Sequence, residues 1–164
     1  MVSVLFVCGT AWTDRAIRAV EQAQGDGTGN PLATHVALFW TPDRGVEACF
    51  PKVRRCTMQQ YGAYDTRRYD LPRSKEQEDV GYTRAYAELG EPYDLWGLVL
   101  AFGYVVTRRP WRFLANDKAR CHCSALATTV LRAMDVPLLP GVPPSNVTPA
   151  ALEAEVARVA AAAL

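Results

Sequence analysis

The strongest constraint on the fold is a change in hydrophobic pattern, from strand-like runs in the first third of the chain to helix-like runs later. Residues 2–7 and 34–40 are apolar runs rich in β-branched and aromatic side chains, as strands are. The segment 41–45, which contains Pro and Gly, joins the second run to another at 46–50, a pattern typical of a β-hairpin. A third strand is expected at 52–57. The sequence therefore predicts a small antiparallel sheet packed against helices, in an α+β domain.

The later helices are predicted from their capping residues. Ser74 and Gln77 form a capping-box pattern, which predicts a helix that stops at Gly90. Thr148 followed by Pro149 predicts an N-cap and first turn for the last helix. Further helices are expected at 13–20, 95–106 and 123–134. Residues 25–31 are expected to form a loop, and the polar, Tyr- and Arg-rich residues 59–73 an irregular segment long enough to cover a substrate.

Length and composition favour one ordinary globular domain over residues 1–164. The chain is 49% hydrophobic and 21% charged, with a formal net charge of +1, so no broad field favours nucleic acid or an anionic membrane. Residues 1–7 lack the basic start of a signal peptide. The longest apolar run, 95–106, is shorter than the roughly 20 residues that a membrane span needs. We therefore expect a soluble, cytoplasmic protein without a transmembrane segment, although export by another route stays open.

The cysteines predict neither a disulfide framework nor a metal site. Their odd number and irregular spacing argue against paired thiols. The consecutive residues Cys121, His122 and Cys123 cannot comfortably give three ligands to one tetrahedral ion, and no second ligand pair completes a set. Cys8, Cys49 and Cys56 fit small buried side chains. No metal or cofactor is predicted.

Three residues form a candidate catalytic set. Cys123 opens an apolar helical run, and a helix N-terminus favours the thiolate, which is the nucleophilic form of cysteine. His35, on a predicted strand, is the candidate base. A hairpin centred on Asp43 places Glu47 nearly opposite Ala37, and therefore on the same sheet face as His35. Glu47 would then orient the imidazole, and the backbone N–H of Cys123 would be an oxyanion-hole donor.

Each of these residues also has a purely structural interpretation. Cys123 fits a buried helix cysteine, His35 a half-buried strand histidine, and Glu47 a solvent-facing strand residue. Cys121 is a competing nucleophile that falls before the expected first helical turn. His122 is too close to Cys123 in sequence for its ring to serve readily as the base.

The order of these motifs resembles a known family. Thr34-His35-Val36 comes first, followed by Glu47, Tyr93-Asp94, Cys123-Ser124-Ala125-Leu126, and Thr148-Pro149 with Leu152. This series, from about residue 2 to 155, resembles the circularly permuted branch of the NlpC-type papain-like hydrolases, which includes YiiX-like bacterial proteins and lecithin:retinol acyltransferase.

The resemblance implies a permuted papain-like fold and a cysteine peptidase, amidase, or acyl-ester hydrolase or transferase acting through a thioester at Cys123, with His35 as base. The acyl substrate would be a small molecule, a peptide or a lipid. Ala125 departs from the acidic residue that relatives usually have at this position, which leaves substrate binding near the nucleophile open.

Two alternatives to this enzyme stay open. The chain would be a non-catalytic binding or structural module if the papain-like fold had lost its chemistry. The segment 4–10, with Cys8, is similar to the phosphate loop of low-molecular-weight tyrosine phosphatases, but Asp14 occupies the position of the required arginine and Arg15 comes one residue late. The arginines and tyrosines of 59–73 are either a site for an acidic substrate or a solvated surface.

Overall fold

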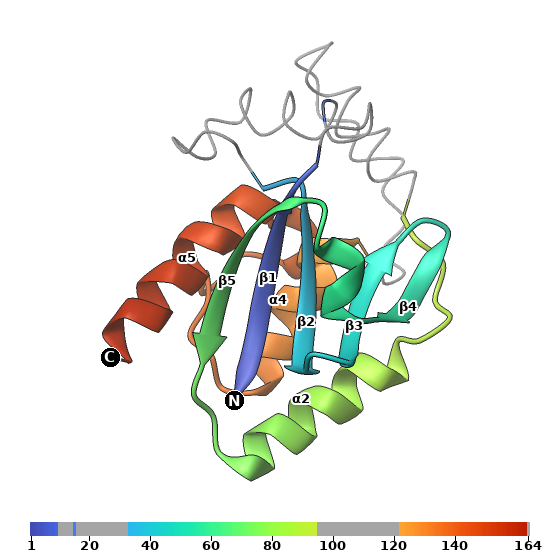
Figure 1. Cartoon of the computed structure of the whole chain (residues 1–164). Helices are drawn as coiled ribbons and strands as arrows, with labels where there is room; N and C mark the ends of the chain where they lie inside the picture. The colour runs from blue at the N-terminus through green and yellow to red at the C-terminus, as the bar shows by residue number, and fades with distance from the viewer. Residues whose placement is uncertain (10–14, 16–32, 95–121, 164) are drawn as a thin grey trace, which may run out of the picture.

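The computed structural model describes residues 1–9, 15, 33–94 and 122–163. The helices expected at 13–20 and 95–106, the loop at 25–31, and Cys121 therefore lie outside the described residues, apart from Arg15. Within these ranges the chain forms an antiparallel sheet and three α-helices (Figure 1). The predicted α+β class is confirmed at this level.

The sheet has five strands within the described residues, in the order β4-β3-β2-β1-β5. Their bounds are β1 (Val2–Cys8), β2 (His35–Thr41), β3 (Arg44–Cys49), β4 (Lys52–Cys56) and β5 (Asp65–Leu71). The first four agree with the predicted strands, and the turn between β2 and β3 is shorter than expected. Glu47 pairs with Ala37 across the hairpin, which confirms the predicted register.

The prediction of an irregular segment at 59–73 is wrong. The short 3₁₀-helix η1 (Met58–Tyr61) is followed by β5, which pairs with β1 along its whole length, from Asp65 opposite Cys8 to Leu71 opposite Val2. β5 is an edge strand that pairs with β1 on one side only, and most of its side chains are exposed or partly buried, so the segment shows no apolar alternation. A polar strand of this kind is difficult to distinguish from a loop by hydrophobicity alone.

The helices begin where their capping residues predict. They are α2 (Lys75–Ala87), α4 (Cys123–Ala133) and α5 (Pro149–Ala162), with a 3₁₀ turn, η3 (Pro144–Asn146), before α5. Ser74 and Gln77 form the capping box of α2, and the Thr148 hydroxyl accepts from the N–H of Ala151 at the start of α5. Gly90, at φ +91°, donates its N–H to Val53 O as the chain leaves α2. These local signals are thus confirmed.

The two faces of the sheet bury different clusters, because alternate strand residues point to opposite faces. Helices α4 and α5 cover one face, where Phe6, Leu38, Leu131 and Leu152 are fully buried (Figure 1). A smaller cluster on the other face includes Leu5, Val7, Ala37, Phe39, Cys56 and Tyr61. His35 shares this second face but is the first residue of β2, so its ring lies at the end of the sheet.

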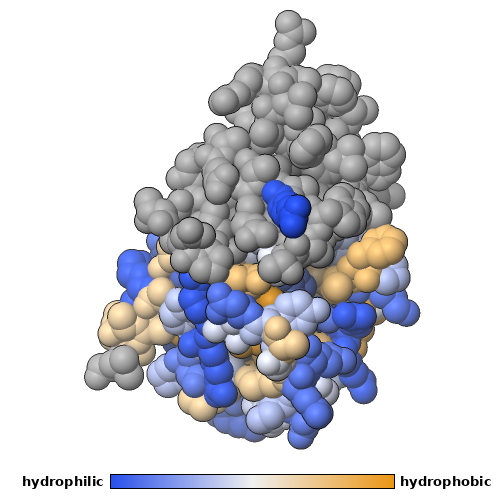
Figure 2. All heavy atoms as spheres, turned by 45° about the horizontal axis from the view of Figure 1, so that its top comes forward, coloured by the Kyte–Doolittle hydropathy of each residue, from blue (hydrophilic) through white to orange (hydrophobic). Residues whose placement is uncertain are grey.

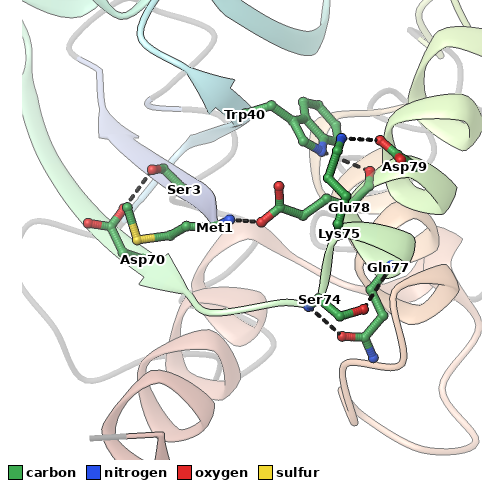
Figure 3. A network of polar contacts seen from close by, with 9 residues as sticks. All are labelled: Met1, Ser3, Trp40, Asp70, Ser74, Lys75, Gln77, Glu78 and Asp79. Carbon is green, nitrogen blue, oxygen red and sulfur yellow. Dashed lines mark hydrogen bonds and ion pairs between the residues drawn. The ribbon is translucent and has the colours of Figure 1, made fainter.

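Polar contacts tie α2 to the opposite end of the sheet. The Met1 ammonium forms an ion pair with Glu78, whose backbone carbonyl accepts from Trp40 Nε1 at 3.1 Å (Figure 3). Ser3 Oγ donates to Asp70 at 2.5 Å and links β1 to β5 in the same region (Figure 3). This end of the domain is therefore fixed independently of the end that carries His35.

The described part of the surface is mostly hydrophilic in the view of Figure 2, with a few apolar groups between charged ones. The exposed large apolar side chains within the described ranges are Phe50, Met1, Tyr64 and Val80. No helix in the described part of the chain is long and apolar enough to cross a membrane.

Candidate active site

Cys123 occupies the first position of α4, as predicted. Its side chain is 4% exposed, and His122 precedes it as the N-cap residue. The first N–H groups of an α-helix have no partner within the helix, and its dipole places positive charge at this end. The position therefore places the backbone N–H groups of the first helical turn beside the thiol, where they can donate to an oxyanion.

His35 contacts both of the other predicted site residues. Its Nε2 lies 2.6 Å from Glu47 Oε2, and its ring is also hydrogen-bonded to the Cys123 thiol. Because Glu47 occupies Nε2, Nδ1 is the ring nitrogen left for the sulfur. The fold thus brings together Cys123, His35 and Glu47, although they come from a helix and two strands.

Glu47 is buried but fully partnered. Its side chain is 3% exposed; Oε2 also accepts from Tyr61 Oη at 2.6 Å, and Oε1 accepts from Arg54 Nε at 2.8 Å. Burial alone would raise the pKa of Glu47, but the hydrogen bonds and charges of His35, Tyr61 and Arg54 outweigh it and lower the pKa from 4.5 to about 2. The carboxylate therefore stays ionised at neutral pH.

The imidazole of His35 is held in its charged form. Burial alone would lower the pKa of His35, but its hydrogen bonds to Cys123 and Glu47 outweigh burial and raise the pKa from 6.5 to about 10. At neutral pH the ring is an imidazolium that donates from Nε2 to Glu47. Its second N–H is directed at the sulfur, as the reaction of a thiolate–imidazolium pair requires.

His122 has a different role from His35, as its position in the sequence suggested. Its Nδ1 accepts from the N–H of Ala125 at 3.3 Å and lies 3.1 Å from Ser124 Oγ, and its Nε2 lies 3.1 Å from Ser145 O. These contacts fit a neutral ring with its hydrogen on Nε2. Burial lowers the pKa of His122, which also favours the neutral form. His122 therefore caps α4 and is not the base.

Ser124 fixes the start of α4 to the segment before α5. Its side chain is fully buried, and its hydroxyl donates to Val147 O at 2.5 Å. Thr148, the next residue, caps α5. The serine after Cys123 thus holds two helix starts together, which fixes the backbone that carries Cys123.

Sequence reasoning missed two residues of the site, Arg54 and Tyr61. Arg54 lies directly opposite Glu47 in the β3–β4 pairing, so counting the expected register across that hairpin would have found it. Tyr61 is in η1, inside the segment expected to be irregular. No pattern in the sequence indicated that its hydroxyl would reach Glu47.

The remaining described cysteines come from the sheet, and Cys56 lies close to Tyr61. Cys8 ends β1, where Arg67 Nη2 approaches its sulfur at 3.4 Å. Burial is the main cause that raises the pKa of Cys56 to about 12, and Cys49 is half-buried. None of the four described cysteines forms a disulfide. The phosphate loop that would follow Cys8 lies outside the described residues, so the phosphatase alternative stays a prediction.

The arginines of 59–73 do not form an open cationic patch. Arg67 pairs with Glu153 at 2.6 Å, and Arg68 pairs with Asp70 at 2.8 Å. Both guanidinium groups already face carboxylates, which weakens the hypothesis of a site for an acidic substrate.

Tyr93 and Asp94, which belong to the predicted motif series, have structural contacts. Tyr93 donates its N–H to Pro51 O at 2.9 Å, and Asp94 is close enough for its charge to act on His122. The helix expected after them lies outside the described residues.

Comparison of the chain with protein-family models, with curated proteins and with solved structures finds no match. Similarity therefore assigns neither a family nor an activity. Within the described ranges, no group of three or more His, Cys, Asp or Glu side chains could hold a metal ion. What the chain can do chemically is therefore inferred from the contacts of Cys123, His35 and Glu47.

Proposed function

We propose that the chain is a cysteine hydrolase or acyltransferase with a permuted, NlpC-type papain-like fold. The observation that carries the proposal is the position of His35, which contacts a helix-terminal thiol on one side and a buried, ionised carboxylate on the other. In this proposal Cys123 is the nucleophile, His35 the general acid and base, and Glu47 the group that orients the imidazole.

The reaction begins with attack of the Cys123 thiolate on the carbonyl carbon of an amide or ester. A carbon–sulfur bond forms, and the carbonyl electron pair moves to the oxygen, which accepts from the backbone N–H of Cys123. The His35 imidazolium then protonates the leaving nitrogen or oxygen as its bond to carbon breaks. The products of this half-reaction are a thioester at Cys123, a neutral imidazole, and a free amine or alcohol.

The second half-reaction uses the same groups in reverse. Neutral His35 removes a proton from water or from an acceptor alcohol or amine, which attacks the thioester carbonyl. The carbon–sulfur bond breaks, the thiolate returns, and the acid or transferred acyl product leaves. Glu47 stays ionised throughout and keeps His35 in one orientation. The chemistry needs no cofactor and accepts small-molecule, peptide or lipid acyl groups in principle, because fold alone does not select among them.

Trapping of the acyl-enzyme tests the proposal. The protein would be incubated with p-nitrophenyl esters of short and long acyl chains, quenched in acid, and mapped by peptide mass spectrometry. We expect acylation at Cys123 in the wild type and its loss in His35→Ala. The Cys8→Ser variant is the matched control and should keep the adduct. Equal acylation of several cysteines, or acylation of Cys123 that ignores His35, would contradict the proposal and favour a non-catalytic module.

A further inference from the structure

Tyr61 binds the same carboxylate oxygen as His35. Glu47 Oε2 accepts from Tyr61 Oη at 2.6 Å and faces His35 Nε2 at 2.6 Å. An ionised carboxylate can only accept hydrogen bonds, so the tyrosine hydroxyl must donate. Arg54 occupies the other oxygen, Oε1. With both oxygens bound, the carboxylate cannot rotate away from the imidazole.

The aromatic ring of Tyr61 is itself fixed by packing. Only 8% of the residue is exposed. Its ring meets Phe39 edge-on, with centroids 6.0 Å apart, and lies nearly parallel to His35 at 6.4 Å. The hydroxyl is therefore placed before any substrate binds, by side chains of the small cluster on the second sheet face. Arg54, by contrast, is half exposed and comes from the edge strand β4.

Cys56 lies behind Tyr61 in the same cluster on the second sheet face. Burial is the main cause that raises the pKa values of both groups and keeps them protonated, and each group also acts on the pKa of the other. Tyr61 donates its single hydroxyl hydrogen to Glu47, so the sulfur of Cys56 adjoins the hydroxyl that binds the carboxylate.

We propose that Tyr61, supported by Cys56, is a positioning residue that holds Glu47 against His35 for the reaction at Cys123. This inference rests on the proposed cysteine hydrolase function and adds a residue that does not touch the reacting atoms. Its role is to supply a donor that an apolar ring of the same shape would lack. Tyr61→Phe therefore separates the hydroxyl from the packing of the ring.

The decisive readout is the titration of Glu47, followed by ¹³C NMR of its carboxyl carbon in wild type and Tyr61→Phe. Loss of one hydrogen bond to a charged group should raise the pH of half-titration by about 1 to 2 units. The low-pH loss of Cys123 alkylation by iodoacetamide should move upward with it. Tyr64→Phe is the matched control, because it keeps the ring that lies 6.4 Å from the Tyr61 ring and removes only the hydroxyl of a residue that is 54% exposed; neither profile should move.

A merely structural role for Tyr61 would lower the melting temperature of Tyr61→Phe and leave the Glu47 titration and the alkylation profile unchanged, and that result would overturn the inference. If Tyr61→Phe does not fold, Cys56→Ala reports on the same hydroxyl and should shift Glu47 by a smaller amount in the same direction. An unchanged Glu47 in that variant would also overturn the inference.

The failure of this inference differs from the failure of the proposed function. Wild-type Cys123 that alkylates slowly and ignores His35 would remove the function, whatever Glu47 does. Fast, His35-dependent alkylation with identical profiles in wild type and Tyr61→Phe would remove only the role of Tyr61.

Discussion

Two carboxylates, the buried Glu47 and the partly buried Glu153, have matching partners on opposite sides of the sheet. Each carboxylate accepts from a tyrosine hydroxyl and pairs with an arginine. A cysteine lies close to the tyrosine in the Glu47 cluster and close to the arginine in the Glu153 cluster. The partners are Tyr61, Arg54 and Cys56 for Glu47, and Tyr69, Arg67 and Cys8 for Glu153. Their pKa values nevertheless shift in opposite directions: that of Glu47 falls to about 2, whereas that of Glu153 is raised.

The difference between the two clusters is the histidine. Burial is the largest single influence on both carboxylates, and Arg67 with Tyr69 does not outweigh it for Glu153. At Glu47 the hydrogen bond and charge of His35 are the largest of the influences that oppose burial. An arginine and a tyrosine around a carboxylate therefore make a structural link between β5 and α5. The addition of an imidazole and a helix-terminal thiol makes a site with the parts of a catalytic centre.

The largest expected effect is the difference in acyl-transfer rate between a variant that lacks Cys123 and a variant that lacks Cys8. Cys123→Ala should lower acyl transfer from an activated ester by about 10³-fold or more, because the nucleophile is lost. Cys8→Ala, beside Arg67 in the Glu153 cluster, should leave the rate within about twofold of wild type. Steady-state release of p-nitrophenol measures both. Loss of activity in Cys8→Ala alone would instead support the phosphatase-like alternative.

Removal of the Glu47 carboxylate should lower the pKa of His35 and the acyl-transfer rate, whereas removal of the Glu153 carboxylate should change neither. Glu47→Gln deprives His35 of its anionic partner, so the pKa of His35 should fall from about 10 toward 6.5, and acyl transfer at pH 7 should fall by about 10²-fold. Glu153→Gln should leave both quantities unchanged. Histidine NMR titration and rate assays on the two variants provide the comparison. Equal effects of the two substitutions would show that Glu47 has no special relation to His35.

The same pair of variants should also differ in stability. Glu47→Gln breaks a buried ion pair and should lower the free energy of unfolding by about 3 kcal/mol. Glu153→Gln should change it by less than about 1 kcal/mol, because the raised pKa of Glu153 means that its charged form adds no stability at pH 7. Urea unfolding at pH 7 measures both values. A larger loss in Glu153→Gln would reverse the ranking of the two clusters.

The pH dependence of stability should have opposite signs for the two carboxylates. The stabilisation from Glu47 is present above its ordinary pKa of 4.5 and is lost as pH falls toward about 2. That from His35 is present below 6.5 and is lost as pH rises toward about 10. Glu153, with a raised pKa, contributes below 4.5 and loses its contribution as pH rises. Each effect is at most about 1.4 kcal/mol per pH unit.

Unfolding free energies of wild type, Glu47→Gln and Glu153→Gln from pH 3 to 10 would show these slopes. The difference between wild type and Glu47→Gln should be greatest between pH 4.5 and 6.5, the ordinary pKa values of Glu47 and His35. A difference that is constant with pH would mean that the ion pair does not contribute to folding.

The sequence was most informative where local chemistry determines structure. Ser74 and Thr148 cap their helices as predicted because an N-cap needs only its own side chain and the next three residues. Glu47 was placed opposite Ala37 because a hairpin converts sequence distance into register. The meeting of Cys123 and His35 needed more than local rules, and it was suggested by the order of the motifs.

The sequence failed where the partner of a residue is far away in the chain. β5 was expected to be irregular because its polar residues show no apolar alternation. It nevertheless pairs with β1 along one edge, and Glu153 accepts from Arg67 and Tyr69 from 84 residues or more away. Tyr61 was missed for the same reason, since its hydroxyl reaches Glu47 only after η1 folds over the second sheet face. Long-range polar contacts of this kind leave no periodic signal.

The most direct test of the central claim is the rate of iodoacetamide alkylation at each cysteine against pH, read by peptide mass spectrometry in wild type and His35→Ala. The thiolate–imidazolium pair predicts fast modification of Cys123 well below the ordinary thiol pKa of about 8.5, and a fall of about 100-fold at pH 6 in His35→Ala. Cys8 and Cys56 serve as internal controls and should stay slow in both proteins. A slow Cys123, with a pH profile that is the same in both proteins, would contradict the account.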